Sequence, residues 1–387
     1  MTTAIPMPSR PIYLDHNATT PVDPRVVAAM LPYLTEHFGN PSSTHPFGAE
    51  PRAAVATARV QVADLIGAQA DEIVFTATGS EADATAIRGV VTAARRAGVE
   101  RPHVITQATE HPAVLAACSY AARHHGAVVT VLDVDIDGLV HPDQVRRAMT
   151  DDTVLVSVMQ ANNETGVLQP IAELAATAHE RGALFHTDAA QSVGKIAVDV
   201  GVLGVDLLTL VGHKMYAPKG IAALYVRTGV DVEALVGGGG QERGRRGGTE
   251  NVPSIVGLGA AARIAADELA AGSPERLAIL RDQLLDLIRG YAPGRVHVNG
   301  AGAPRLPQTL NISIDGTQGH AVLDQCPGVA ASTGSACHSG QHSPSPVLTA
   351  MGLTPERAMA ALRLTLGRWT DGQQITAAAD ELGRAVR

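Results

Sequence analysis

Short apolar runs alternate with amphipathic stretches along residues 50–230, and this pattern predicts an α/β fold. Seven runs have the length and the β-branched content of strands. They lie at 72–76, 103–107, 128–132, 154–159, 183–187, 206–211 and 221–226. Helical patterns separate most of them, which indicates a mostly parallel seven-stranded sheet with helices on both faces. Only 212–220 separates the last two runs, which is too short for a helical crossover, so we expect that pair to be antiparallel.

The pattern changes after a glycine-rich segment at 237–248. An Ala- and Leu-rich helical stretch covers about 253–290, and shorter strand patterns follow in "RVHVNG", "TLNISID" and "ALRLTLG". These features predict a smaller α+β domain joined to the first through the glycines. We therefore expect an N-terminal segment (1–20), a large domain (21–252) and a small domain (253–387).

Composition and charge exclude several classes of protein. Hydrophobic residues make up 45% of the chain and charged residues 18%, as in an ordinary globular protein. The net charge of -8 argues against a nucleic-acid-binding surface. No apolar run is long enough to span a membrane, and the first twenty residues lack the apolar segment of a signal peptide. We therefore expect a cytoplasmic protein without a membrane or a direct nucleic-acid partner.

The three cysteines, Cys118, Cys326 and Cys337, are odd in number and show no CxxC spacing. A disulfide framework and a structural metal site are therefore not expected. Cys118 and Cys326 lie in apolar helical patterns and are interpreted as buried structural residues. Cys337 lies instead between glycines and serines, where an inert surface thiol is the simplest interpretation if nothing else is considered.

Polar motifs follow five of the predicted strands at the point where each strand ends. In open α/β sheets, ligands bind outside the carboxyl ends of the strands. The segment "ATGSEA" follows the first strand and opens a helix near Ser80, where backbone N–H groups favour a phosphate. The other motifs bring to the same edge His111, Asn163, Asp188, Gln191, His213 and Lys214.

These residue types together match the needs of one cofactor. Alone, a lysine after a strand is usually on the surface, and an aspartate there usually caps a helix. Lys214 is, however, one of only three lysines in the chain. Pyridoxal phosphate needs N–H donors for its phosphate, a lysine for its aldehyde and a carboxylate for its ring nitrogen, and a histidine can stack on the ring. The edge is therefore predicted to bind pyridoxal phosphate.

Long motifs along nearly the whole chain resemble those of the cysteine desulfurases and the similar selenocysteine lyases. These are class V aminotransferase-type enzymes with the fold-type-I architecture of pyridoxal-phosphate proteins. The motifs include "YLDHNATTPVDPRV", "HFGNPSSTHPFG", "NNETGVLQPI", "HTDAAQSVGK", "GHKMYAPKGIAALYVR" and "STGSACHSG". The resemblance implies a desulfurase that converts L-cysteine to L-alanine and leaves a persulfide on Cys337 for a sulfur-acceptor protein.

The resemblance also implies a role for each site residue. The catalytic residues would be Lys214, which carries the Cα proton, His111, which stacks on the ring and acts in acid–base steps, and Cys337, the sulfur acceptor. The residues that bind the cofactor would be Gly79, Ser80, His111, Asn163, Asp188, Gln191, His213, Lys214 and Thr249. Thr249 would reach the phosphate of the other subunit, which implies a homodimer. The residues that bind the substrate would be Asn17, Asn163 and Arg363, with Arg363 on the carboxylate. The large domain (21–252) would thus bind the cofactor, the small domain (253–387) would carry Cys337 and Arg363, and the N-terminal segment (1–20) would pack near the active site.

The chain departs from the usual family pattern in three places. The segment "ATGSEADA" replaces "SGATESNN", Val211 replaces a phosphate-binding serine, and His16 stands where Asn or Tyr is more common. The motifs "VGHK", "GHAVLDQC" and "ACHS" also favour the selenocysteine lyases, whereas the length of "STGSACHSG" is that of bacterial desulfurases.

Other functions remain as alternatives. L-Selenocysteine is an alternative substrate, and another C–S lyase is a second alternative. An inactive cofactor-bound scaffold is a remote alternative, which the intact set of site residues disfavours. A Rossmann-type dehydrogenase is disfavoured because no GxGxxG turn follows the first strand.

Overall fold

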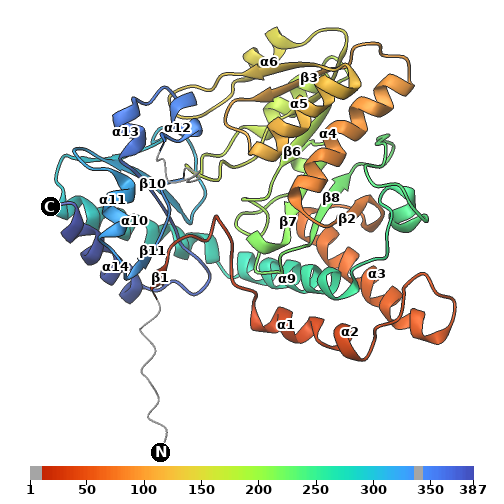
Figure 1. The fold of residues 1–387 in the computed structure, drawn as a ribbon, viewed down its shortest axis with the longest axis horizontal. Coiled ribbons are helices and arrows are strands. Elements are labelled where there is room, and N and C mark those ends of the chain that lie inside the picture. Colours follow the sequence, from red (N-terminus) through yellow and green to blue (C-terminus); the bar gives the residue numbers. More distant parts are fainter. Residues whose placement is uncertain (1–10, 335–342) are drawn as a thin grey trace, which may run out of the picture.

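The computed structural model describes residues 11–334 and 343–387, which fold around a large and a small β-sheet (Figure 1). In these ranges the large sheet has seven strands in the order β2-β8-β7-β6-β5-β3-β4. They are β2 (Ile73–Thr76), β3 (His103–Gln107), β4 (Val128–Leu132), β5 (Thr153–Ser157), β6 (Leu184–Asp188), β7 (Leu207–Val211) and β8 (Ala222–Val226). Strand β8 is antiparallel to both of its neighbours, and the other pairs are parallel. The predicted strands and the antiparallel pair are confirmed.

Helices cover both faces of this sheet because its strands alternate their apolar side chains between two cores. In β8, Ala223 and Tyr225 belong to one core, and Leu224 and Val226 belong to the other. The second of these cores contains side chains of α4 (Gly79–Arg96) and α5 (Pro112–His125). The first contains side chains of α1 (Pro24–Met30), α3 (Pro46–Ile66), α6 (Pro142–Ala148), α7 (Ile171–His179), α8 (Val200–Leu203) and α9 (Val252–Ala270).

Helices α3 and α9 pack closely against each other, and a glycine permits their approach. A Cβ atom at Gly259 of α9 would lie 2.6 Å from the Cα atom of Ala58 in α3, which is far inside van der Waals contact. Helix α3 then ends at Gly67, whose φ of 67° lies in the left-handed region that glycine adopts without strain. The short helix α2 (Pro32–Thr35) links α1 to the loop that precedes α3.

The small domain is built on an antiparallel sheet with its own apolar core. Its strands are β9 (Val296–Val298), β10 (Thr309–Ile314) and β12 (Ala361–Thr365). Its helices are α10 (Ser273–Tyr291), α11 (Gly319–Asp324), α12 (Pro346–Ala350), α13 (Pro355–Met359) and α14 (Gly372–Ala385). Helices α10 and α14 pack together beside the sheet and contribute to the core.

The N-terminal segment connects the two domains. Strand β1 (Ile12–Tyr13) pairs in parallel with β11 (Val329–Ala330) of the small domain, and Leu14 is part of the small-domain core. The chain then crosses to the large domain, where Thr20 donates a backbone hydrogen bond of 2.9 Å to the carbonyl oxygen of His213.

The two helices after the glycine-rich segment belong to different cores. Apolar residues of α9 pack in the large-domain core, whereas Leu277, Leu284 and Ile288 of α10 pack in the small-domain core. The segment 237–248 itself lies against the large domain, where Glu242 accepts two hydrogen bonds of 2.7 Å from Arg59. The predicted division of the chain at residue 252 stays a prediction, and from this packing we propose that the joint is the turn between α9 and α10. No helix in the described ranges is both long and apolar enough to cross a membrane.

Candidate active site

A pocket of about 470 Å³ opens at the carboxyl edge of the large sheet. Ten of the predicted site residues line it, namely Asn17, Gly79, Ser80, His111, Asn163, Asp188, Gln191, His213, Lys214 and Arg363. A larger depression of about 930 Å³ lies on the small domain, around α11 and α13, and contains none of them. The site is therefore the smaller pocket, where the chemically distinctive side chains meet.

Lys214 ends a short 3₁₀ turn, η2 (Gly212–Lys214), that follows β7. Its Nζ donates hydrogen bonds to the backbone carbonyls of Asn17, at 2.5 Å, and Ala18, at 2.7 Å. Burial and the nearby Arg363 guanidinium lower the pKa of Lys214 to about 8, although Asp188 and Asp15 act in the opposite direction. The amine can therefore lose its proton close to neutral pH, as a nucleophile or a general base must.

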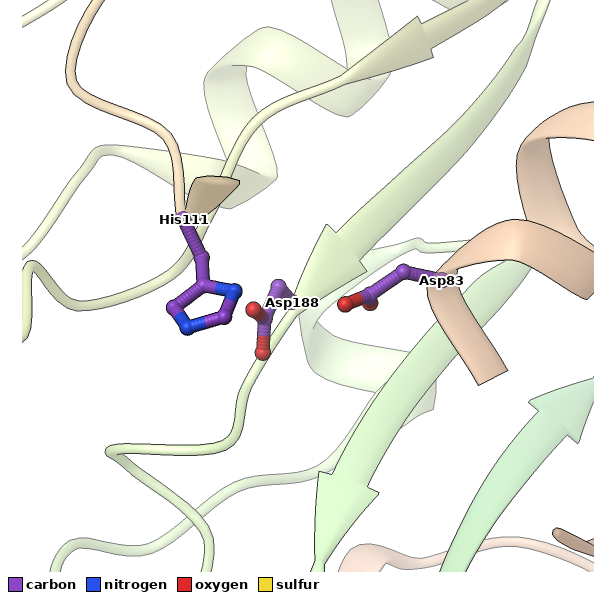
Figure 2. Close-up of side chains that lie close together, drawn as sticks. All are labelled: Asp83, His111 and Asp188. Atoms are coloured by element: carbon purple, nitrogen blue, oxygen red, sulfur yellow. The ribbon is translucent and has the colours of Figure 1, made fainter. Parts of the chain in front are cut away.

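Asp188 and His111 lie close together in the pocket, as Figure 2 shows. Asp188 is the last residue of β6, and its Oδ1 accepts a 2.9 Å hydrogen bond from the backbone N–H of Ala190. His111 precedes α5, and its Nδ1 accepts a 3.2 Å bond from the N–H of Ala113, which leaves Nε2 as the protonated nitrogen of the neutral ring. Desolvation lowers the pKa of His111, and the Asp188 carboxylate opposes this effect.

The first turn of α4 presents unpaired N–H groups at one corner of the pocket. The N–H groups of Gly79 and Ser80 have no acceptor within the helix, because they belong to its first turn. A Cβ atom at Gly79 would lie 2.5 Å from a methyl group of Val211, so glycine is required where valine replaces the usual serine. The Nδ1 of His213 contacts the Thr19 hydroxyl at 3.1 Å, and burial lowers the pKa of His213 to about 4. The imidazole is therefore neutral at pH 7 and offers one N–H donor.

Arg363 in β12 brings the small domain into the site. Its Nη2 donates a 2.8 Å hydrogen bond to Asp15 Oδ1, and its Nη1 donates a 3.3 Å bond to the carbonyl of Asn163. Arg363 is 6% exposed. Asn17 lies beside it and uses its side-chain N–H groups on the Asn163 carbonyl and on Thr309. Asn17 thus positions its neighbours, and its own carbonyl also accepts from Gln191 at 3.0 Å.

One predicted residue, Thr249, is not part of the lining of this pocket. Thr249 lines a separate cavity of about 220 Å³ that shares Ala77, Gly220 and Ile221 with it. Cys337 lies outside the described residues. The other two cysteines, Cys118 and Cys326, are buried, as expected.

Two acidic residues of the site were not predicted. Asp15 pairs with Arg363, and Asp83 lines the pocket one helical turn after Gly79. The spacing within "ATGSEADA" was a usable signal for Asp83, because residues one turn apart share a helix face. Nothing in the local sequence identifies Asp15, because its partner lies in the last strand of the small domain.

The polar groups that line the pocket are of the kinds that pyridoxal phosphate needs as hydrogen-bonding partners. Buried polar atoms of its lining have no partner among the described residues: Asn17 Oδ1, Asp83 Oδ1, Gln191 Oε1 and Arg363 Nε. Buried polar atoms are normally paired, so these are expected to meet a polar ligand. The sequence predicts no metal site, and this stays a prediction, because the ligand atoms of Asp83, His111 and Asp188 are close enough for an ion to bridge.

Known proteins resemble the chain over nearly its full length. The family model described as "Aminotransferase class-V" matches residues 12–377. A protein named cysteine desulfurase from Trichormus azollae is 48% identical over 366 residues, which cover 94% of this chain and 90% of that protein. A structure titled "NIFS-LIKE PROTEIN" has a TM-score of 0.87 at 32% identity and covers 97% of this chain and 98% of its own. A structure titled "SspA in complex with cysteine" has a TM-score of 0.81 at 36% identity, with 92% and 98% covered.

Proposed function

Because the chain belongs to the class V aminotransferase family, we propose that it is a cysteine desulfurase that uses pyridoxal phosphate. It takes sulfur from L-cysteine and leaves L-alanine. The observation that carries the proposal is the single pocket that joins a lysine of lowered pKa, a buried aspartate, a histidine and an arginine. The cysteine-bound structure among the relatives supports L-cysteine as the substrate.

The cofactor would be held by residues at the strand ends. The N–H groups of Gly79 and Ser80 and the imidazole of His213 would bind its phosphate. Asp188 would pair with its ring nitrogen, Gln191 and Asn163 would bond its polar edge, and His111 would stack on the ring. When bound, pyridoxal phosphate supplies an aldehyde that links to amines and a ring that accepts electrons from the substrate Cα.

Lys214 would move the Cα proton. Its amine has a pKa of about 8, so roughly a tenth of it is uncharged and available as a base at pH 7. The carbonyls of Asn17 and Ala18, which now accept hydrogen bonds from it, would stabilise the ammonium group that forms when the proton is taken. Arg363 would meanwhile hold the substrate carboxylate and fix the position of Cα.

Cys337 would remove the sulfur. The thiolate is the nucleophilic form of cysteine, and its attack on the substrate sulfur forms an S–S bond as the C–S bond breaks. The product on the enzyme is a persulfide, which would pass to a sulfur-acceptor protein. This role is inferred from the family resemblance, since Cys337 lies outside the described residues.

We also propose that the protein is a homodimer. Several large apolar side chains on α1–α3 and in the loop between α2 and α3 are exposed, namely Val27, Leu31, Leu34, Phe38 and Phe47. Exposed apolar patches of this kind usually mark a protein interface. Phe38 and Thr249 line one shallow depression, so a second subunit on this surface would meet the residue expected to reach its phosphate. The cytoplasmic location stays a prediction.

Chemical trapping tests the cofactor and the lysine together. Apo-protein given pyridoxal phosphate should develop a visible or near-ultraviolet absorption band, and borohydride should fix the cofactor on the peptide that contains Lys214. The initial trapping rate should rise with pH and level off above about 8, because only the neutral amine reacts. Peptide mass spectrometry locates the label. Labelling of Lys195 or Lys219 would overturn the assignment.

Alanine release tests the reaction. Wild-type protein with L-cysteine should release alanine and, without reductant, should gain one sulfur on the peptide that contains Cys337. Cys337→Ala should abolish alanine release from L-cysteine. Selenium leaves carbon more readily, so the same variant should retain some turnover of L-selenocysteine. Brisk turnover of selenocysteine by the wild type, with negligible turnover of cysteine, would instead make the protein a selenocysteine lyase.

A further inference from the structure

Asp83 is a buried carboxyl group beside the proposed cofactor site, and none of the roles above uses it. It belongs to α4, lines the pocket and is 1% exposed. Its Oδ1 has no hydrogen-bonding partner in the ranges that the structure describes. Figure 2 shows the Asp83 carboxyl group facing the Asp188 side chain, and the ligand atoms of these two residues and His111 all lie within 4.8 Å of one another.

Two ionised carboxylates at this separation repel each other strongly in a buried site. The environment of Asp83 disfavours its charge further. Burial raises the pKa of Asp83 well above its usual range, Asp188 and the buried Glu110 raise it more, and a hydrogen bond with the Thr209 hydroxyl lowers it only in part. Asp83 is therefore the carboxyl group of the pair that stays protonated at neutral pH.

Asp188 has the better environment for a negative charge. Although burial raises its pKa, the N–H of Ala190 donates to its Oδ1, and His111 and Lys214 both favour the carboxylate. Asp83 lacks a comparable cation among the groups that act on it in the described ranges. The single negative charge of the pair is thus on Asp188, which is the residue that a ring nitrogen would meet.

A neutral polar chain extends from Asp83 into the sheet. The Nε2 of His186 contacts the Thr209 hydroxyl at 3.2 Å and lies 3.8 Å from Asp83 Oδ1, and its Nδ1 contacts the Ser157 hydroxyl at 2.8 Å. Burial lowers the pKa of His186 to about 3, so this ring carries no charge that could pair with an ionised Asp83. The titratable and polar groups around Asp83 are Glu110, His111, Cys118, His186, Asp188 and Thr209.

We propose that Asp83 is a positioning residue for Asp188: its neutral carboxyl group holds the Asp188 side chain in place and leaves a single negative charge at the base of the pocket. This role rests on the proposed function, because a fixed charge on Asp188 serves catalysis only if a cofactor nitrogen binds there. An asparagine has the shape and the hydrogen-bonding capacity of a protonated aspartate. Asp83→Asn should therefore act like the wild type, whereas Asp83→Ala should not.

The protonation state can be tested without any cofactor. In apo-protein labelled with ¹³C on the aspartate carboxyl groups, one aspartate should remain protonated at neutral pH. Its NMR signal should disappear in Asp83→Asn and persist in Asp286→Asn, an exposed control on α10. Because only aspartate is labelled, the buried Glu110 does not contribute. The absence of a protonated aspartate, or its survival in Asp83→Asn, would overturn the proposal.

The positioning role is tested by the affinity for pyridoxal phosphate and by the pH titration of the bound absorption band. Asp83→Asn should match the wild type within about twofold, and Asp83→Ala should bind at least about tenfold more weakly, as is typical when a supporting group is lost. Thr209→Val, which keeps the size of the side chain, should also weaken binding and serves if Asp83→Ala does not fold. Thermal unfolding of each apo-protein separates this effect from instability.

The outcomes distinguish this proposal from the proposed function. Wild-type protein that binds no pyridoxal phosphate would refute the function, while the NMR experiment would still decide the state of Asp83. Equal losses in Asp83→Asn and Asp83→Ala would show that Asp83 acts as an anion, contrary to the proposal. Unchanged affinity and an unchanged titration in Asp83→Ala and Thr209→Val would show that Asp83 does not position Asp188.

Discussion

Arg363 is already paired with an internal anion at the point where a substrate carboxylate would bind. Its Nη2 contacts Asp15 at 2.8 Å, whereas its Nε has no partner among the described residues. A substrate carboxylate must therefore share the guanidinium with Asp15 or displace it. If Arg363 binds the substrate as proposed, Asp15 would keep the arginine ordered between turnovers and would also weaken its attraction for the substrate.

This arrangement gives two substitutions opposite effects on substrate affinity. Arg363→Ala should weaken L-cysteine binding by about 2–5 kcal/mol, as when one partner of a buried charge pair is lost. Asp15→Asn should lower KM for L-cysteine by roughly fivefold, about 1 kcal/mol, because the competing charge is removed while the side-chain shape is kept. Steady-state alanine release measures both. An increase of KM in Asp15→Asn would mean that Asp15 mainly orders the arginine.

At the same scale, local sequence identified residues that follow strands and missed residues that act across domains. The positions of Lys214, Asp188 and His111 in the pocket could be predicted because each lies at or just after the end of a strand at the carboxyl edge of the sheet. Asp15 could not, because its role depends on a partner 348 positions away in the chain. The role of Arg368 likewise depends on tertiary contacts, since it forms ion pairs with Asp23 and Glu268 away from the pocket.

At the scale of elements, α3 (residues 46–66) packs against α9 (residues 252–270). This contact joins two parts of the large domain that lie far apart in the chain. Gly259 allows the two helices to approach so closely that an added methyl group overlaps the backbone of Ala58. Such overlap cannot be relieved by a rotamer change, because the atom it meets belongs to a helix backbone. The close packing of the large-domain core therefore depends on this one position.

A pair of glycine substitutions tests this contact. Gly259→Ala should lower the free energy of unfolding by about 1–3 kcal/mol through overpacking. Gly290→Ala, on the exposed face of α10 where nothing lies within 4 Å, should raise it by roughly 0.5 kcal/mol through helix propensity. Chemical denaturation of the two variants beside the wild type measures both changes. A stabilised Gly259→Ala would mean that the helices can move apart at little cost.

The sequence predicted most elements of the fold, but it did not predict how the helices after the glycine-rich segment pack. All seven strands of the large sheet could be read from runs of β-branched and apolar residues. The helical stretch after the glycine-rich segment is two helices, α9 and α10, that pack into different cores. Apolar periodicity identifies a buried helix, but it carries no information on which sheet buries that helix.

At the scale of the molecule, the exposed apolar surface on α1–α3 suggests how two copies meet. Wild-type protein should sediment as a dimer, and Phe38→Ser combined with Leu34→Ser should shift it toward the monomer, because the interface loses its apolar contacts. Ile279→Ser is a matched control, since Ile279 is 68% exposed, close to the 70% of Phe38, but lies on the small domain. Analytical ultracentrifugation measures the change. A monomeric wild type, or dissociation caused only by Ile279→Ser, would contradict this interface.

Residues 12–20 of the N-terminal segment connect the two domains, and this has a consequence for how the protein is made. A ribosome releases these residues first, but Asn17 bonds to Thr365, which is synthesised 348 residues later. Strand β1 lacks its neighbour β11 until residues 329–330 have been made, and the carbonyl groups that hold Lys214 are not anchored until Thr365 follows. Contacts of such long range form late in folding. The pocket is therefore completed only when almost the whole chain has emerged, so an interrupted translation product cannot assemble it.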